Sequence, residues 1–240
     1  MNEPVKINGW AQGLLEISKT QKEVLGSLRL TADGRKFRYA KAGAAALGAG
    51  LMGILAPVIA LHINCSVAKA AAIGDREVQI TVGATAVTVD QYKDGYLQIN
   101  DGTGEGMQYG IESNTACAVN GTTVVSLKDP IQVALVAAAT SEVSLIPNPW
   151  NGVTESATSE SGAAGIAPVA VTIAYYYWCQ TGGVAVVLAE GTDAIGTTLE
   201  LGAGAGAVKV QAGYTCNLVG TIFGTAFIAA EYKPIWLTID

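Results

Sequence analysis

One run of residues, 168–180, constrains the fold of this chain more than any other part of the sequence. It reads PVAVTIAYYYWCQ, and its β-branched and aromatic side chains favour a strand. Alternate side chains of a strand point to opposite faces, and in this run neither face is polar. The run therefore predicts a strand that is buried on both faces, as in the middle of a β-sandwich or barrel.

A turn and a second strand are predicted directly after this run. Residues 181–183 are Thr-Gly-Gly, which is typical of a turn, and residues 184–188 are Val-Ala-Val-Val-Leu. We therefore expect strand 184–188 to pair with the first strand as a hairpin. The rest of the chain is expected to surround such hairpins.

Short apolar runs separated by turn residues fill most of the remaining sequence. Residues 27–40 predict two strands around the turn Asp33-Gly34, with Phe37 and Tyr39 on one packed face. Further strands are predicted at 78–82, 86–89, 96–99, 107–111, 122–127, 132–135, 143–146, 197–201, 208–210, 219–223 and 235–239. In the last of these, Trp236 lies on the face opposite Ile235 and Leu237.

The N-terminal residues 1–26 are polar, but Trp10, Leu14 and Ile17 recur at helical spacing before Gly26. We expect a short helical or extended arm. Two interpretations stay open, because the arm could dock on a partner or pack on its own domain.

Residues 42–61 carry no charge and are long enough to cross a membrane. The first half of this segment is mostly Ala and Gly, and Pro57 interrupts the more apolar half. A segment that runs beneath a β-core accounts for both features, so we expect no membrane span.

The fold class expected from these patterns is all-β, with one or two small β-barrels or sandwiches. The predicted domains are an N-terminal arm at 1–26, a β domain at 27–150 with a long connecting segment at 42–70, a flexible loop at 151–167, and a second β domain or second half of the core at 168–240. The Pro, Ser, Thr and Gly content of 147–167 suggests the internal boundary.

Charge and cysteine content exclude several functions. The net charge is −6, and the basic residues lie mostly before residue 45, so we expect no nucleic-acid partner. Cys65, Cys117, Cys179 and Cys216 form no Cys-x-x-Cys pair, which argues against zinc. Buried free thiols are expected, with two disulfides as the alternative. The polar start of the chain indicates assembly in a reducing cytoplasm rather than secretion.

The sequence also lacks a clear catalytic motif. The Gly-rich loop 101–106 sits between two predicted strands and lacks a following helix, so it predicts a hairpin turn rather than a phosphate site. His62 is the only histidine and is expected to be structural. The aromatic residues 175–178 are expected in the core rather than at a sugar site. We therefore expect no enzymatic activity, no cofactor and no metal.

Four phrases of the sequence resemble structural proteins of tailed bacteriophages. They are TADGRKFRYAKAG at 31–43, DGYLQINDGTGEG at 94–106, IPNPWNGV at 146–153 and VLAEGT at 187–192. The resemblance extends from about residue 27 to the C-terminus and is to capsid decoration (cement) proteins. It implies a compact β protein, often a homotrimer, that sits on the capsid exterior of the virion and binds the major capsid protein after assembly in the host cytoplasm.

Under this resemblance, Trp10, Leu14 and Ile17 are the expected capsid-contact residues, since a few apolar anchors dominate such interfaces. An alternative function is that of a phage fibre or adhesin that binds carbohydrate through exposed aromatic side chains. A hydrolase that uses scattered carboxylates is the third hypothesis, although no segment points to a carboxylate pair.

Overall fold

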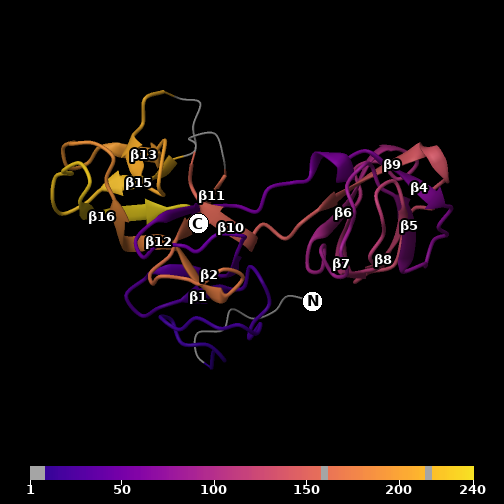
Figure 1. Ribbon diagram of the computed structural model, residues 1–240, viewed down its shortest axis with the longest axis horizontal. Helices are drawn as coiled ribbons and strands as arrows, with labels where there is room; N and C mark the ends of the chain where they lie inside the picture. The colour runs from indigo at the N-terminus through magenta and orange to yellow at the C-terminus, as the bar shows by residue number, and fades with distance from the viewer. Residues whose placement is uncertain (1–8, 158–161, 214–217) are drawn as a thin grey trace. The chain divides into compact units, whose positions relative to one another are not determined.

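The structure is a computed structural model, and it describes residues 9–157, 162–213 and 218–240. The described chain is all-β, as predicted, and its one helical element is a single 3₁₀ turn, η1, at Ala60–His62 (Figure 1). The strands fall into two compact units. The first unit combines Met1–Ala56 with Pro149–Asp240, and the second unit is Pro57–Asn148.

The second unit is a closed antiparallel barrel. Its strands follow the order β4-β5-β8-β7-β6-β9, and β9 pairs back to β4. Alternate residues such as Val78, Ile80 and Leu97 fill its core. The strands are β4 (Cys65–Lys69), β5 (Glu77–Thr81), β6 (Tyr96–Gly102), β7 (Gln108–Asn114), β8 (Thr122–Leu127) and β9 (Ala138–Ile146).

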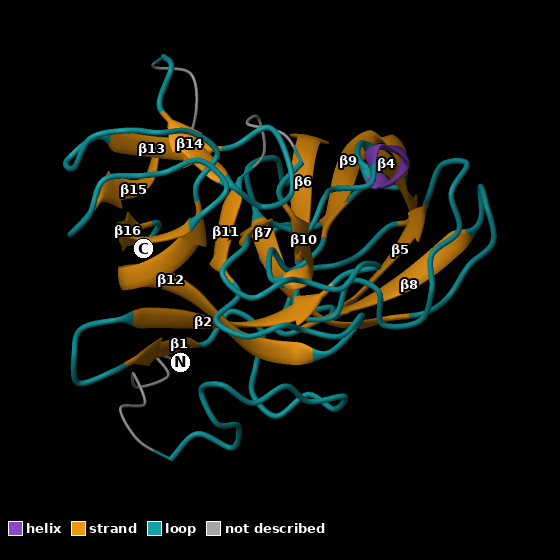
Figure 2. Ribbon diagram, turned by 60° about the vertical axis from the view of Figure 1, so that its left-hand side comes forward, coloured by secondary structure: helices purple, strands orange, loops and turns teal. Residues whose placement is uncertain are grey.

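The first unit is a large sheet in the order β1-β2-β10-β3-β11-β12-β16-β15-β13-β14. Strand β12 also pairs with β2, which closes β2, β10, β3, β11 and β12 into a ring of strands. Figure 2 shows β16, β15, β13 and β14 extending from that ring. The strands are β1 (Leu28–Leu30), β2 (Lys36–Ala42), β3 (Met52–Ile54), β10 (Asn151–Glu155), β11 (Ala163–Ile166), β12 (Tyr176–Leu188), β13 (Thr198–Leu201), β14 (Val208–Val210), β15 (Leu218–Ile222) and β16 (Tyr232–Thr238).

The predicted hairpin at 168–188 is wrong, because a single strand, β12, runs from Tyr176 to Leu188. Residues 168–175 precede it as turns and bends, with Ala174 at a φ of 61°. The expected turn at 181–183 is a bulge, since the register against β2 shifts between Gln180 and Gly182 and Gly183 has a φ of 82°. At this point β12 leaves β2 and pairs with β16.

The division of the chain also differs from the predicted domains. The predicted flexible loop 151–167 contains β10 and β11, and its residues 158–161 lie outside the described part of the chain. The predicted connecting segment 42–70 contains β3 and β4, which belong to different units. Pairing of β2 with β12 joins segments more than 130 residues apart, and no local pattern signals such a pairing.

Most of the shorter strand predictions are confirmed. Strands β1 and β2 form a hairpin around Asp33-Gly34, with Phe37 and Tyr39 fully buried. The loop 103–107 is a hairpin turn between β6 and β7, as expected. Segments 86–89 and 132–135 are not strands and make only the isolated bridges Val87–Cys117 and Ala71–Leu135.

In the part of the chain that the structure describes, no helix is long and apolar enough to cross a membrane. The uncharged segment 42–61 contains strand β3 and the start of η1.

Candidate binding surface

The N-terminal arm, described from residue 9, lies on the face of β2 and β12 that carries Tyr39 and Trp178. No helix forms in residues 9–27, so the expected short helix is absent from the described arm. The edge of the Trp10 ring meets Trp178, with ring centroids 4.8 Å apart. A two-residue bridge between Ser18 and Tyr176 fixes the middle of the arm to β12.

The three residues expected to contact a capsid are therefore engaged within their own unit. Trp10 and Leu14 pack against the Tyr39–Trp178 cluster, and Ile17 packs against the core of the strand ring. This is the arrangement of the second interpretation, in which the arm packs on its own domain. Whether the three residues also meet a capsid stays a prediction.

Gln12 is the main polar link between the arm and the sheet, and it is 1% exposed. Its side-chain amide donates to the main-chain oxygens of Glu16 at 2.7 Å and Tyr176 at 3.0 Å. Its side-chain oxygen accepts from the Tyr39 hydroxyl at 2.6 Å. Burial raises the pKa of that hydroxyl, so Tyr39 keeps the proton that it donates to Gln12.

Arg29 and Trp178 hold the main chain of the arm from the other side. The carbonyl oxygen of Gln12 accepts from Arg29 Nη1 at 3.0 Å and from Trp178 Nε1 at 3.2 Å. The Arg29 guanidinium also lies 5.3 Å from the Trp178 ring centroid and 5.9 Å from that of Trp10. This face of the sheet thus binds a peptide segment through an arginine, an indole N–H and apolar contacts.

A cavity of about 690 Å³ lies further along β12, and we call it the Gln180 cavity. Gln180, Val184 and Val186 of β12 form part of its lining. Its other walls include Leu15 of the arm, Arg35 of the β1–β2 turn, Gly50, Ile166, Pro168 and Tyr232. Its volume falls within the range of ligand pockets, roughly 300–1,000 Å³.

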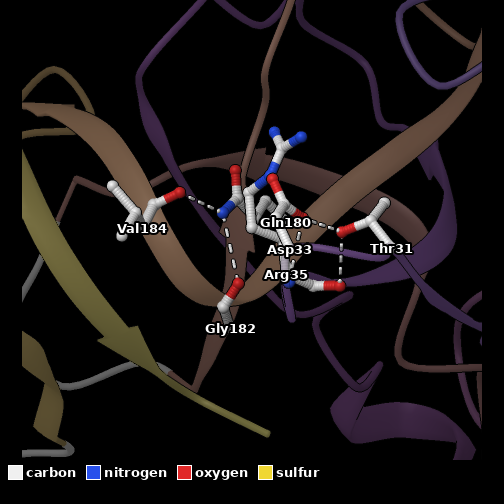
Figure 3. A network of polar contacts seen from close by, with 6 residues as sticks. All are labelled: Thr31, Asp33, Arg35, Gln180, Gly182 and Val184. Atoms are coloured by element: carbon white, nitrogen blue, oxygen red, sulfur yellow. Dashed lines mark hydrogen bonds and ion pairs between the residues drawn. The ribbon is translucent and has the colours of Figure 1, made fainter.

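Gln180 presents a fixed amide to this cavity. Its Nε2 donates to the carbonyl oxygens of Val184 at 2.8 Å and Gly182 at 3.2 Å (Figure 3). Because these partners can only accept, the NH₂ group must face them, and the opposite position is the amide oxygen. That oxygen receives no hydrogen bond from any described residue and is reachable by solvent, so a molecule in the cavity can donate to it.

Arg35 supplies the charged group of the cavity. Its Nε donates to Asp33 Oδ2 at 2.7 Å, and Thr31 donates to the same carboxylate (Figure 3). The Thr31 hydroxyl and then the Arg35 side chain lower the pKa of Asp33 by hydrogen bonding. The ion pair uses one edge of the guanidinium, and the two terminal nitrogens remain available to a ligand.

The outer side of the sheet is apolar both at the cavity and next to it. On β12 and β16, Ala185, Val187, Ile235 and Leu237 face the buried core. The alternate residues Val184, Val186, Tyr232 and Trp236, together with Phe223 after β15, are 40–53% exposed. We call these five residues the outer apolar face. Cross-strand pairing places Val184 opposite Trp236, and the Phe223 and Trp236 rings lie 6.3 Å apart.

This face departs from the usual pattern of an antiparallel sheet. Such sheets commonly bury one face and place polar residues on the other. A continuous exposed apolar area made of large side chains is typical of a surface that meets another molecule. The sequence already indicated an exposed apolar face, because both sides of the predicted strand 184–188 are apolar and Trp236 in 235–239 faces away from the core.

The other residues singled out from the sequence lie in the core or in turns. His62 is fully buried in the barrel unit, where Nε2 donates to the Thr85 carbonyl at 2.9 Å and Nδ1 accepts from the Tyr92 hydroxyl. Both ring nitrogens are therefore paired, which fits the expected structural role. Burial raises the pKa of Tyr92, with a smaller contribution from Cys65.

The described cysteines and the aromatic run follow the expected pattern in part, because Cys65 and Cys179 are buried but Cys117 is only half-buried. Cys65, Cys117 and Cys179 are free thiols, and Cys216 lies outside the described residues. Tyr177 and Trp178 are buried in the core, as predicted, while Tyr175 and Tyr176 are half-buried. Within the described ranges, no cluster of His, Cys, Asp and Glu could hold a metal ion.

The sequence matches no protein-family model, no curated protein and no solved structure.

Proposed function

We propose that this chain is a structural virion protein that decorates and stabilises a tailed-phage capsid by binding the major capsid protein. The outer apolar face is the observation that carries the proposal. Four of its five side chains stand on the paired strands β12 and β16, and Phe223 directly follows β15 with its main-chain N–H bonded to the Pro234 carbonyl, so their positions are set by the hydrogen-bonded sheet. A rigid apolar surface suits a permanent protein contact because little conformational entropy is lost on binding.

The phrases that resemble decoration proteins support the same proposal. Two of them, 31–43 and 187–192, fall on or directly beside strands β2 and β12 of the first unit. Under the proposal the protein sits on the capsid exterior, and homotrimers are the expected oligomer. The low fraction of charged residues, 14%, is compatible with broad apolar contacts.

Deleting the arm is a poor test of this proposal. The arm covers Tyr39 and Trp178, and its removal would expose a new apolar surface on the same unit. Substitutions of exposed residues avoid this problem, because they leave the core unchanged.

The experiment is co-sedimentation of the purified chain with capsids that lack it. We expect Trp236→Lys and Phe223→Lys each to weaken capsid binding by about tenfold or more, because a charge is placed at the centre of an apolar contact. Val89→Lys and Ile73→Lys are matched controls, since these side chains are 68% and 69% exposed in the barrel unit. Wild-type sedimentation by both outer-face variants would contradict the proposal.

A carbohydrate-binding adhesin is the second candidate, and the exposed Trp236, Phe223 and Tyr232 favour it. Aromatic rings displayed on a sheet can stack on sugars. Binding to a glycan array that disappears in Trp236→Lys, together with no sedimentation on capsids, would support this candidate instead.

A further inference from the structure

The Gln180 cavity continues the surface on which the arm is bound. Trp178 and Gln180 are two residues apart in β12, so their side chains point to the same face of the sheet. Trp178 lies beneath the arm, whereas Gln180 lines the cavity, and Leu15 of the arm forms one of the cavity walls. One face of β12 thus carries a filled peptide site and, next to it, an unfilled space.

The two sites share the same kind of polar group. In the filled site, the Arg29 guanidinium donates to the main-chain carbonyl of Gln12. In the cavity, Arg35 holds two terminal nitrogens that can donate in the same way. The Gln180 amide oxygen is open to the cavity and can accept a hydrogen bond from a ligand, and its orientation is fixed by the two bonds of Nε2.

These groups select among ligand chemistries. A carboxylate could accept from Arg35, but it would offer no donor to Gln180 and would meet the nearby Asp33 carboxylate. A peptide segment carries both kinds of group, since a peptide carbonyl can accept from Arg35 and a peptide N–H can donate to Gln180. The lining by Leu15, Ile166, Pro168 and Val186 suits an apolar side chain on the same peptide.

We propose that the Gln180 cavity binds an extended apolar peptide segment of another protein, with Arg35 donating to a peptide carbonyl and Gln180 accepting from a peptide N–H. The segment does not come from the arm of a second copy, because the apolar anchors Trp10, Leu14 and Ile17 are already packed within their own unit. The cavity shares Val184, Val186 and Tyr232 with the outer apolar face, but its lining includes neither Phe223 nor Trp236, on which the capsid proposal is tested.

The test uses the full chain labelled with ¹⁵N and ¹³C, and acetyl-Ala-Leu-Ala-N-methylamide as the probe. We expect saturable NMR shifts of the Gln180 side-chain amide and of the Val184 and Val186 methyl groups at millimolar peptide. Arg35→Met should weaken the peptide about tenfold, which corresponds to the loss of one charged hydrogen bond. Arg76→Met, in the barrel unit, is the matched control and should bind as wild type.

Gln180 is tested from the ligand side, because its own replacement would break two structural hydrogen bonds. The probe is remade as ester analogues in which one N–H at a time is replaced by oxygen. At least one analogue should bind about tenfold more weakly than the amide. Ala49→Trp, which fills the cavity from an exposed wall position, should abolish the shifts.

The proposal is overturned if the peptide causes no saturable shifts at these residues, if Arg35→Met and Ala49→Trp bind as wild type, or if every ester binds like the amide. The measurement contains no capsids. Its failure therefore leaves the capsid proposal standing, and failure of the sedimentation experiment leaves the peptide site standing.

Discussion

Replacing Gln12 by alanine should release the N-terminal arm from β12. The substitution removes three buried hydrogen bonds, two from Nε2 and one to Oε1. A typical intramolecular hydrogen bond contributes about 1 kcal/mol net, and a buried donor without a partner costs about 1–3 kcal/mol. The Tyr39 hydroxyl becomes such a donor, because it is fully buried and loses its acceptor.

The Tyr176 carbonyl keeps one partner in this variant, because it still accepts from the Ser18 amide at 3.0 Å. We therefore assign the main cost to Tyr39 and expect the arm to lose about 3 kcal/mol of stability. Local opening exposes the Ser18 amide, and hydrogen exchange reports the free energy of that opening. About 3 kcal/mol corresponds to roughly 100-fold faster exchange.

Hydrogen exchange by NMR at Ser18 is the assay, and trypsin cleavage after Lys19 and Lys22 is a second readout. The matched control is Gln21→Ala, which removes one exposed hydrogen bond to the Glu23 carbonyl and should change exchange little, by less than about 0.5 kcal/mol. If Gln12→Ala exchanges at Ser18 like the control, Gln12 does not hold the arm and the reasoning is refuted.

Three further predictions concern the cores of the two units. Gly165→Ala should lower the free energy of unfolding of the first unit by more than about 3 kcal/mol, because Gly165 has a φ of 137° and an added Cβ would lie 2.3 Å from the Gln180 carbonyl oxygen. The control is Gly204→Ala, whose added Cβ has no atom within 4 Å and which should leave the urea midpoint nearly unchanged. His62→Ala should destabilise the barrel unit by about 2–4 kcal/mol, since it leaves Tyr92 and Thr85 without their buried partner, and an unchanged urea midpoint would contradict this. Burial raises the pKa of Cys179 to about 12, so the folded state keeps the thiol proton that the unfolded state loses near pH 9. The free energy of unfolding should therefore fall above pH 9, by up to about 1.4 kcal/mol per pH unit. Cys179→Ala should remove this contribution to the pH dependence of the free energy of unfolding, measured between about pH 8 and 10.

The parts of the fold that depend on neighbouring residues could be predicted from the sequence. The Asp33-Gly34 hairpin and the alternation around Trp236 follow from turn chemistry and from the two-residue period of a strand. Thr181-Gly182-Gly183 was misassigned because a bulge and a turn use the same residues, and only the distant strands β2 and β16 decide between them.

The arm and the cavity needed the tertiary structure. Trp10, Leu14 and Ile17 are spaced as on a helix, but an irregular chain with a turn at Gly13–Glu16 brings the same residues onto the sheet. The Gln180 cavity is lined from the arm, the β1–β2 turn, the segments before β3 and after β11, and strands β11, β12 and β16. No local pattern connects these segments.

The copy number of this protein in purified virions, measured by quantitative mass spectrometry against the major capsid protein, tests the central claim most directly. A decoration protein bound through the outer apolar face is predicted to be present at a fixed ratio to the major capsid protein. Presence in only a few copies would contradict decoration of the shell and favour the adhesin, and absence from the virion would refute the proposed function.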